Sequence, residues 1–284
     1  MNWTPPVMHK TRFLLLLSFL MISMPFAQVW ADTVLFFAPT RVEIIDQKPV
    51  QEIRITNMSN IARSYSVSLK NLAMDENGHT ARVDTFDYSA KRMLRFVPRQ
   101  FDIKPGEKQI IRIMARFPEG TQDGEYHAHL EFLENISKRA ELNKEASPEN
   151  QAKAKAQIAY ATAIPVVISK GAIKTDIAVH NIVVGKDGKS GRPNISMVLD
   201  RSGNGQGNAL IEADYIAPDG TEKKAAVRRS VFIYREIDQR KHAFILELLD
   251  QKDIQNGGKI RVKLFNKNIS ESTPVDTVLV PVSH

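Results

Sequence analysis

Polar and apolar residues alternate along most of the chain after position 31. Every second side chain is apolar in the runs 53–56, 65–69 and 126–132, and the run 109–113 shows the same period after a one-residue shift. Segments rich in Gly, Pro and Asn separate the runs, at 57–60, 75–78, 104–106 and 120–124. Short alternating strands bounded by such turns predict an antiparallel β-sandwich.

A longer apolar segment, QIAYATAIPVVIS at 157–169, predicts a long strand that ends this first group, and Gly171 then marks a hinge. Seven further strand-like runs follow, at 176–184, 194–199, 209–216, 226–234, 243–249, 259–265 and 277–282. Seven short strands in about 110 residues match one immunoglobulin-like sandwich. We therefore expect an all-β protein with two β-sandwich domains, residues 32–171 and 172–284.

The segment 134–155 breaks this rhythm. It is rich in Lys, Glu, Ala, Asn and Gln, and its large aliphatic residues are Ile136 and Leu142. Without an apolar stripe it shows no helical period of useful length, and we expect a long, solvated, partly mobile loop. Loops beyond about 12–15 residues in a compact domain are usually functional or disordered.

The N-terminus has the pattern of a secretory signal peptide. Residues 1–12 are basic and carry no acid, an apolar run covers 13–24, and Val29, Trp30 and Ala31 form a small-residue cleavage site. The run is shorter than the ~20 residues of a membrane span, and Pro25 ends it. We expect a signal peptide at 1–31, cleavage after Ala31 and no stable membrane insertion.

Composition excludes several classes of protein. The net charge of +7 falls to +5 after cleavage, because two basic residues leave with the signal peptide. No dense stripe of Lys and Arg with interleaved aromatics appears, so nucleic-acid binding is not expected. The chain has no Cys, which excludes disulfides and Cys-based zinc sites. The common motifs of hydrolases, P-loop proteins and dinucleotide-binding proteins are absent as well, so we predict no catalytic residues and no cofactor.

Four titratable residues alternate on one predicted strand: Glu125, His127, His129 and Glu131. Their side chains share one face of that strand. Two His residues at i and i+2 could supply half of a metal site, but further ligands would have to come from neighbouring strands. We favour the simpler interpretation, a solvated strand face without a metal.

The predicted strand at 157–169 is almost uncharged on both faces. One face, continued back to Ala156, carries Ala156, Ile158, Tyr160, Thr162 and Ile164. Such a strand is either central in the first sandwich or keeps an apolar face for a partner. Pro165 favours an edge position, because proline has no N–H for a central ladder. Exposed apolar edges promote aggregation, so a protein that keeps one has a use for it.

Several landmarks along the first domain occur in a familiar order. They are APTRV at 38–42, ITN at 55–57, FVPRQFDIKPG at 96–106 followed by QIIRI at 109–113, DGEY at 123–126, and the strand end at 161–168. This order resembles the PapD-like periplasmic chaperones of bacterial chaperone–usher pili, over roughly residues 33–170. The second domain matches only in length and strand rhythm. Pro165 stands where the family typically has a Lys and Asp102 where it has an Arg, which indicates a divergent branch.

The resemblance implies two immunoglobulin-like domains in an L-shaped arrangement and a periplasmic, non-enzymatic chaperone. Its partners would be pilus or fimbrial subunits and an outer-membrane usher. Arg41 would anchor the subunit's C-terminal carboxylate. The side chains lent to the subunit would be Ala156, Ile158 and Tyr160, continuing through Thr162 and Ile164.

Two other classes of function remain open. One is a secreted structural or adhesive envelope protein that binds glycan or matrix through its two sandwiches. The other, more remote, is a secreted metal-dependent enzyme that uses His127 and His129.

Overall fold

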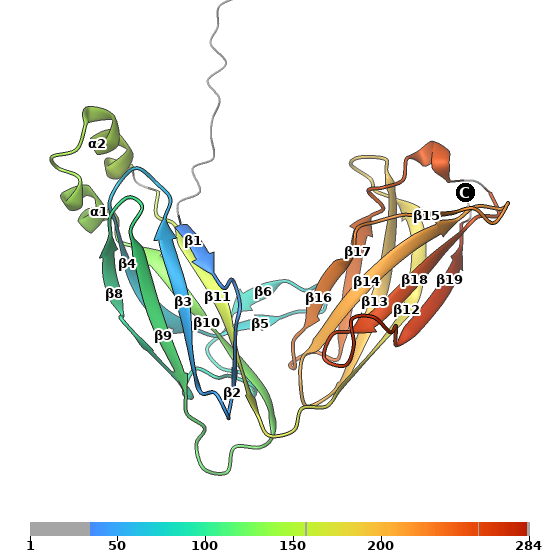
Figure 1. The fold of residues 1–284 in the computed structure, drawn as a ribbon, viewed down its shortest axis with the longest axis horizontal. Helices are drawn as coiled ribbons and strands as arrows, with labels where there is room; N and C mark the ends of the chain where they lie inside the picture. Colours follow the sequence, from blue (N-terminus) through green and yellow to red (C-terminus); the bar gives the residue numbers. More distant parts are fainter. Residues whose placement is uncertain (1–34, 157, 255, 283–284) are drawn as a thin grey trace, which may run out of the picture. The chain divides into compact units, whose positions relative to one another are not determined.

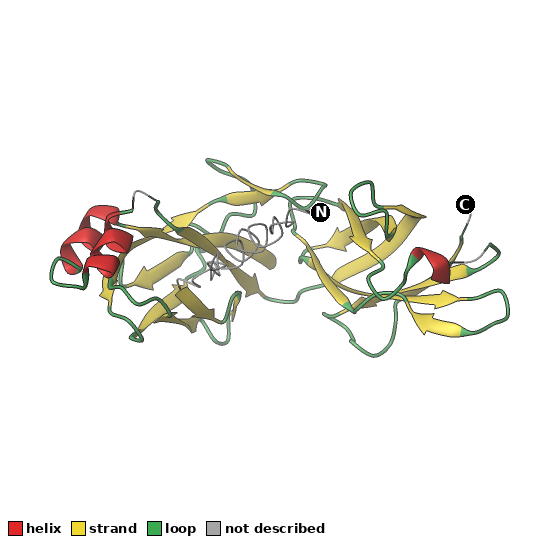
Figure 2. Cartoon of the chain, turned by 90° about the horizontal axis from the view of Figure 1, so that it is seen from above, coloured by secondary structure: helices red, strands yellow, loops and turns green. Residues whose placement is uncertain are grey.

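The computed structural model describes residues 35–156, 158–254 and 256–282 (Figure 1). The expected signal peptide, residues 1–31, lies outside these described residues. Strands dominate the described chain, and the exceptions are two short α-helices and a 3-10 turn at Gln251–Asp253 (Figure 2). None of the described helices has the length and apolar character needed to cross a membrane. The expected all-β fold is confirmed.

The first sandwich consists of two sheets. One has the strand order β1-β3-β9-β7, with β1 at Leu35–Ala38, β3 at Val50–Asn57, β9 at Lys108–Ala115 and β7 at Leu94–Val97. The other has the order β2-β11-β10-β4-β8, with β2 at Val42–Ile45, β11 at Ala161–Lys170, β10 at Gly124–Glu134, β4 at Arg63–Lys70 and β8 at Gln100–Ile103. A separate hairpin joins β5 at Leu72–Met74 to β6 at Thr80–Arg82.

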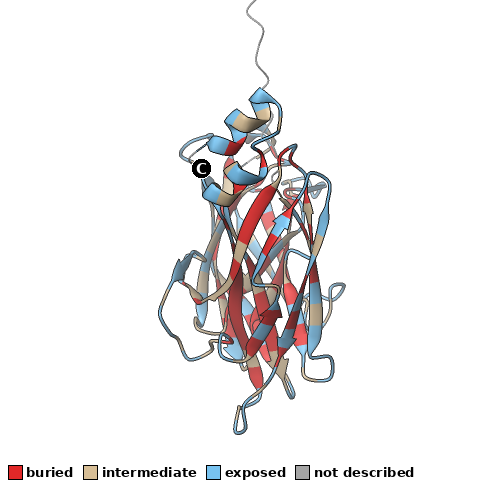
Figure 3. Ribbon diagram, turned by 90° about the vertical axis from the view of Figure 1, so that its left-hand side faces the viewer, coloured by how far each residue is buried: buried red, intermediate tan, exposed pale blue. Residues whose placement is uncertain are grey.

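The period-two pattern of the sequence produces the core of this sandwich. In β9, Ile111 and Ile113 are fully buried, while the alternate residues Ile110 and Arg112 are exposed. The same alternation buries every second residue of most strands, and Figure 3 shows it as red and pale segments following one another. Residues of one parity therefore meet between the two sheets, as expected for side chains that alternate across a strand.

The second sandwich has a separate hydrophobic core. One sheet has the order β12-β13-β17, with β12 at Thr175–Lys186, β13 at Pro193–Gly203 and β17 at Gln239–Ile245. The other has the order β15-β14-β18-β19, and β16 also pairs with β14; the bounds are β14 Gly207–Ile216, β15 Glu222–Lys224, β16 Arg229–Ile233, β18 Lys259–Asn266 and β19 Asp276–Pro281. The seven predicted runs correspond to all of these strands except the three-residue β15.

The segment 134–155 is not the loop that its composition suggested. It folds into α1, Ile136–Leu142, and α2, Pro148–Lys155, which lie at one end of the first sandwich (Figure 1). Side-chain caps start both helices, with Asn135 before α1 and Ser147 before α2. Burial of polar groups replaces the missing apolar stripe, since Arg139 is 1% exposed. Hydropathy alone could not reveal helices held in this way.

The long apolar strand also differs from its prediction. We expected it to begin at 157, but β11 begins at Ala161. Its antiparallel partner β10 ends at Glu134, opposite Tyr160, where the chain turns into α1, so the residues before Tyr160 have no strand beside them on that side. Residues 158–160 lie outside the assigned strand and lead into β11.

Candidate functional site

One edge of β11 is only half covered. β11 pairs with β10 along its whole length, from Ala161 opposite Leu133 to Lys170 opposite Gly124. On its other edge it pairs with β2 only at residues 166–169. In the described part of the chain no strand pairs with residues 161–165 on that edge. The first half of β11 is thus an open strand edge, the kind of edge that can accept a strand from another protein.

The backbone direction of the residues before this open edge follows from Tyr160, whose N–H and carbonyl groups both face β10. The carbonyl oxygen of Tyr160 accepts from the Glu134 N–H at 3.0 Å, and the Tyr160 N–H donates to Glu134 Oε2 at 3.3 Å. Because backbone groups of successive residues in an extended chain point to opposite sides, those of Ala159 and Ala161 point away from β10. Of the described residues, 159, 161 and 163 therefore offer backbone groups without a neighbouring strand along one line.

The five side chains predicted to be lent to a subunit differ in their surroundings. Ile158 is 67% exposed and Tyr160 is 47% exposed, whereas Ile164 is only 4% exposed and belongs to the hydrophobic core of its own sandwich. Ala156 is exposed at the end of α2, and Thr162 is half-buried. The structure thus leaves the early members of the row accessible, while Ile164 packs inside the chain itself.

An ion pair supports the exposed Tyr160. Arg63 Nη1 donates to Glu134 Oε1 at 2.6 Å, and the Arg63 guanidinium carbon lies 5.5 Å from the centre of the Tyr160 ring. Both charged groups are buried, and burial raises the pKa of the adjacent Tyr65. Sequence analysis missed Arg63 and Glu134, because a charge inside a strand pattern normally indicates solvent.

Arg41 lies where the first sandwich meets the second. Residues 34–284 form one compact unit that includes both sandwiches. The side chain of Arg41 is 15% exposed, and its Nε donates to Glu43 Oε1 at 3.0 Å. Its Nη2 donates to Gln206 of the second sandwich, and its guanidinium stacks 4.3 Å from the Phe232 ring centre. Arg41 is therefore a partly buried cation that already has one carboxylate partner.

Lys170 cannot act together with Arg41 on one carboxylate. The parallel register places Val42 beside Val166, so Arg41 is level with Pro165. Lys170 is five residues further along β11, about 16 Å away at the usual rise of a strand. Its Nζ donates to the carbonyl oxygen of Thr121. Pro165, level with Arg41, supplies no second cation there, and Lys170 does not do so either.

The row of titratable residues on β10 is not a solvated face, which corrects our expectation. His127 and His129 are 3% and 5% exposed. His127 Nε2 lies 3.0 Å from Glu236 Oε2, and burial lowers the pKa of His129 to about 4. Within the described residues, no three His, Cys, Asp or Glu side chains converge in a way that could hold a metal ion. The row serves as a packing surface instead.

The surface that covers this row comes from the end of β16 and the turn after it. The Tyr234 ring stacks 4.2 Å from His127, and Arg235 lies 4.2 Å from the ring centre of Tyr88. Glu236 accepts from His127 and also from the Met74 N–H, the latter at 2.8 Å. Sequence analysis missed these contacts, because nothing in an alternating strand shows which distant strand it will touch.

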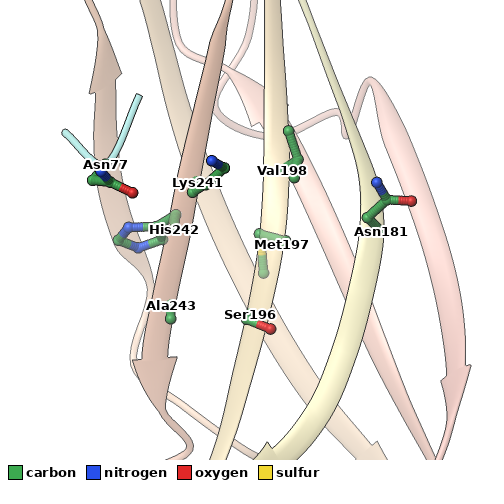
Figure 4. Close-up of a pocket in the computed structure, with 8 residues that line it drawn as sticks. All are labelled: Asn77, Asn181, Ser196, Met197, Val198, Lys241, His242 and Ala243. Carbon is green, nitrogen blue, oxygen red and sulfur yellow. The ribbon is translucent and has the colours of Figure 1, made fainter. Parts of the chain in front are cut away.

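The β5–β6 hairpin adds a further contact with the second sandwich. The Lys241 N–H in β17 donates to the Glu76 carbonyl oxygen at 2.6 Å, and their side chains form an ion pair. Asn77 beside them helps to line a pocket of about 430 Å³ (Figure 4). The lining residues are Asn77, Asn181, Ser196, Met197, Val198, Lys241, His242 and Ala243. The pocket is part of the contact between the hairpin and β12, β13 and β17.

Comparison with known proteins gives a likeness in fold. No protein-family model matches the chain, and no curated protein does. Similar solved structures include the CsuC–CsuE chaperone–tip subunit pre-assembly complex of Acinetobacter baumannii Csu pili, with 13% identity, coverage of 87% of this chain and 96% of that one, and a TM-score of 0.44.

Two further structures are similar to the same extent. The YadV chaperone is 13% identical, with 87% of this chain and 100% of that chain covered and a TM-score of 0.44. The CupB2 chaperone of Pseudomonas aeruginosa is 10% identical, with 87% and 100% covered and a TM-score of 0.42. A likeness at this identity concerns the fold alone, so a function has to be argued from the residues of this chain.

Proposed function

We propose that this protein is a periplasmic, non-enzymatic chaperone that binds incomplete pilus or fimbrial subunits and passes them to an outer-membrane usher. The observation that carries the proposal is the open edge at 161–165 together with the exposed Ile158 and Tyr160 beside it. A subunit that lacks one strand would take residues 158–163, here called the donor segment, into its own sheet. This mode of recognition is strand addition.

Backbone and side chains of the donor segment contribute differently to such binding. The backbone groups of residues 159, 161 and 163 would form the ladder with the subunit, which fixes direction and register. Ile158 and Tyr160 would enter its apolar groove. Burial of a side chain such as Ile stabilises a complex by about 1.5–3 kcal/mol. Thr162 adds a smaller contact, and Ala156 lies at the beginning of the row.

Arg41 is the proposed anchor for the C-terminal carboxylate of the subunit. A guanidinium binds a carboxylate through charge-assisted hydrogen bonds, often two in parallel. In the free chain, Glu43 already accepts a hydrogen bond from this guanidinium. The Glu43 side chain is 60% exposed. An incoming carboxylate would replace an exposed partner that contributes little, since exposed ion pairs are worth about 0–1 kcal/mol.

The absence of cysteine from the chain permits a direct test. A single cysteine is introduced as Ile158→Cys, and in a matched control as Val183→Cys in the second sandwich, where Val183 is 59% exposed. Each variant is co-expressed in the periplasm with small secreted proteins of pilin type, and the rate of maleimide labelling is measured with and without a captured subunit. Protection of position 158 alone supports the proposal. Equal labelling of both positions in a stable complex would refute the donor segment, and failure to capture any subunit would favour an adhesive envelope protein.

A further inference from the structure

Arg139 of α1 is a buried cation that binds the chain before and at the start of the donor segment. Its Nε donates to the carbonyl oxygen of Ala154 at 2.9 Å, its Nη1 to that of Ile158 at 3.1 Å, and its Nη2 to that of Ala156. One guanidinium thus holds three alternate carbonyl groups between the end of α2 and the donor segment. Arg139 is 1% exposed, which makes it one of the most deeply buried large side chains in the described chain.

Glu134 neutralises this cation and continues the same row of contacts. Its Oε2 accepts from Arg139 Nη1 at 2.7 Å and from the Tyr160 N–H at 3.3 Å, and its Oε1 accepts from Arg63. Its backbone N–H donates to the Tyr160 carbonyl oxygen at 3.0 Å. These hydrogen bonds of the pair reach the backbone of the segment, on the side that faces β10. The side chains of Ile158 and Tyr160 and the opposite backbone edge stay available.

Helix α1 carries Arg139 to this place. Asn143 fixes α1 to the sandwich, because its side-chain amide exchanges two hydrogen bonds with the backbone of Ala62, at 3.0 and 2.8 Å. Asn150 of α2 donates to the carbonyl oxygen of Asn60 at 3.3 Å. Polar contacts with one loop of the sandwich therefore hold both helices. The segment 134–155 therefore supports the cation and is not a free surface loop.

We infer that Arg139 and Glu134 are positioning residues that keep the donor segment extended and in register before a subunit arrives. The inference rests on the proposed function. A flexible segment would lose conformational freedom on binding, and a segment that is already ordered avoids this loss. The pair acts through the backbone, so it improves capture of any subunit that accepts the segment, without contacting the subunit itself.

The test compares variants that keep the buried charge balanced. Arg139→Lys keeps a cation beside Glu134 but cannot bind three carbonyl groups at once. Glu134→Asp keeps the carboxylate but withdraws it by one methylene from the Tyr160 N–H and from Arg139. The control is Arg112→Lys, in an exposed pair with Glu52 on the other sheet. Hydrogen exchange of residues 158–163 and of β9 is measured in the free chain, under conditions where circular dichroism shows each variant folded. If Arg139→Lys does not fold, Glu134→Asp supplies the same comparison.

We expect exchange of the Tyr160 N–H, which is hydrogen-bonded in the free chain, to accelerate about tenfold or more in both variants, while exchange in β9 and in the control stays unchanged. Affinity for a subunit that the wild-type chain captures should fall about tenfold, mainly through slower association. Unchanged exchange of the Tyr160 N–H in a folded variant would overturn the inference, and so would faster exchange with unchanged affinity. Failure of the wild-type chain to capture any subunit would contradict the proposed function instead, and the exchange result would still decide the ordering role.

Discussion

Two isoleucines of the same row, six residues apart, offer a sharp comparison. Ile158 and Ile164 have the same parity along the chain, yet Ile158 is 67% exposed and Ile164 is 4% exposed. Replacement of each isoleucine by aspartate makes the same chemical change at an exposed and at a buried position. If the donor segment is reserved for a partner, Ile158→Asp affects binding and Ile164→Asp affects folding.

The expected magnitudes are well separated. Surface substitutions such as Ile158→Asp usually change the free energy of unfolding by less than about 0.5 kcal/mol. Truncation of a core Ile costs about 2–5 kcal/mol, and a buried unpaired carboxylate adds to this. A loss of about 4 kcal/mol lowers Tm by about 10 °C or more for a chain of this size. In binding, loss of about 1.5–3 kcal/mol from burial of Ile158 weakens capture roughly 10- to 150-fold.

Thermal melts and subunit pull-downs on both variants measure the two effects. We expect Ile158→Asp to keep the Tm of the wild-type chain and to lose the subunit, and Ile164→Asp to melt much earlier. If Ile158→Asp unfolded like Ile164→Asp, residue 158 would be part of the core and the donor segment would be wrong. Retained capture by a folded Ile158→Asp variant would contradict the reasoning equally.

Three further results are expected. Arg41→Ala should abolish subunit capture in a pull-down while the chain stays folded. Gln206→Ala removes only the neutral partner of Arg41 and should retain capture. Equal capture by the two variants would contradict the anchor role of Arg41. Burial lowers the pKa of His129 to about 4, below its unfolded value of about 6.5, so its contribution to stability is complete above pH 6.5 and is lost as the pH falls toward 4. Urea unfolding at pH 7 and 4.5 should show a smaller pH effect in His129→Gln, and an identical effect would refute this role. Gly203→Ala should lower Tm far more than Gly120→Ala, because both glycines have positive φ but only a Cβ at 203 would meet a backbone carbonyl oxygen.

Most strands could be predicted from the sequence, because a strand with one buried face shows a period of two wherever it lies in a sheet. The helices α1 and α2 could not. Their burial depends on Arg139 and Asn143, and polar residues give no apolar stripe. The partners of Arg139 are carbonyl groups up to 19 residues away, which no local pattern encodes.

The candidate site also has features that the sequence predicted and features that it could not predict. The apolar row that begins at Ala156 was visible in the sequence, but its periodicity is identical for the exposed Ile158 and the buried Ile164. The row on β10 is similar, since alternation placed His127 and His129 on one face and suggested solvent, while Tyr234 and Glu236 from the second sandwich cover that face. Alternation shows which side chains share a face of a strand, but it does not show which residues pack against that face.

The sequence by itself thus determined the all-β class, the period of the strands and the row of residues that could serve a partner. The tertiary structure decided which part of that row is accessible, by ending β10 at Glu134 and pairing β2 only with residues 166–169. It also decided that a buried cation holds the start of the donor segment. The physical reason is that periodicity follows from the local geometry of one strand, whereas exposure and ion pairing depend on segments that are distant in the sequence and meet only in the folded chain.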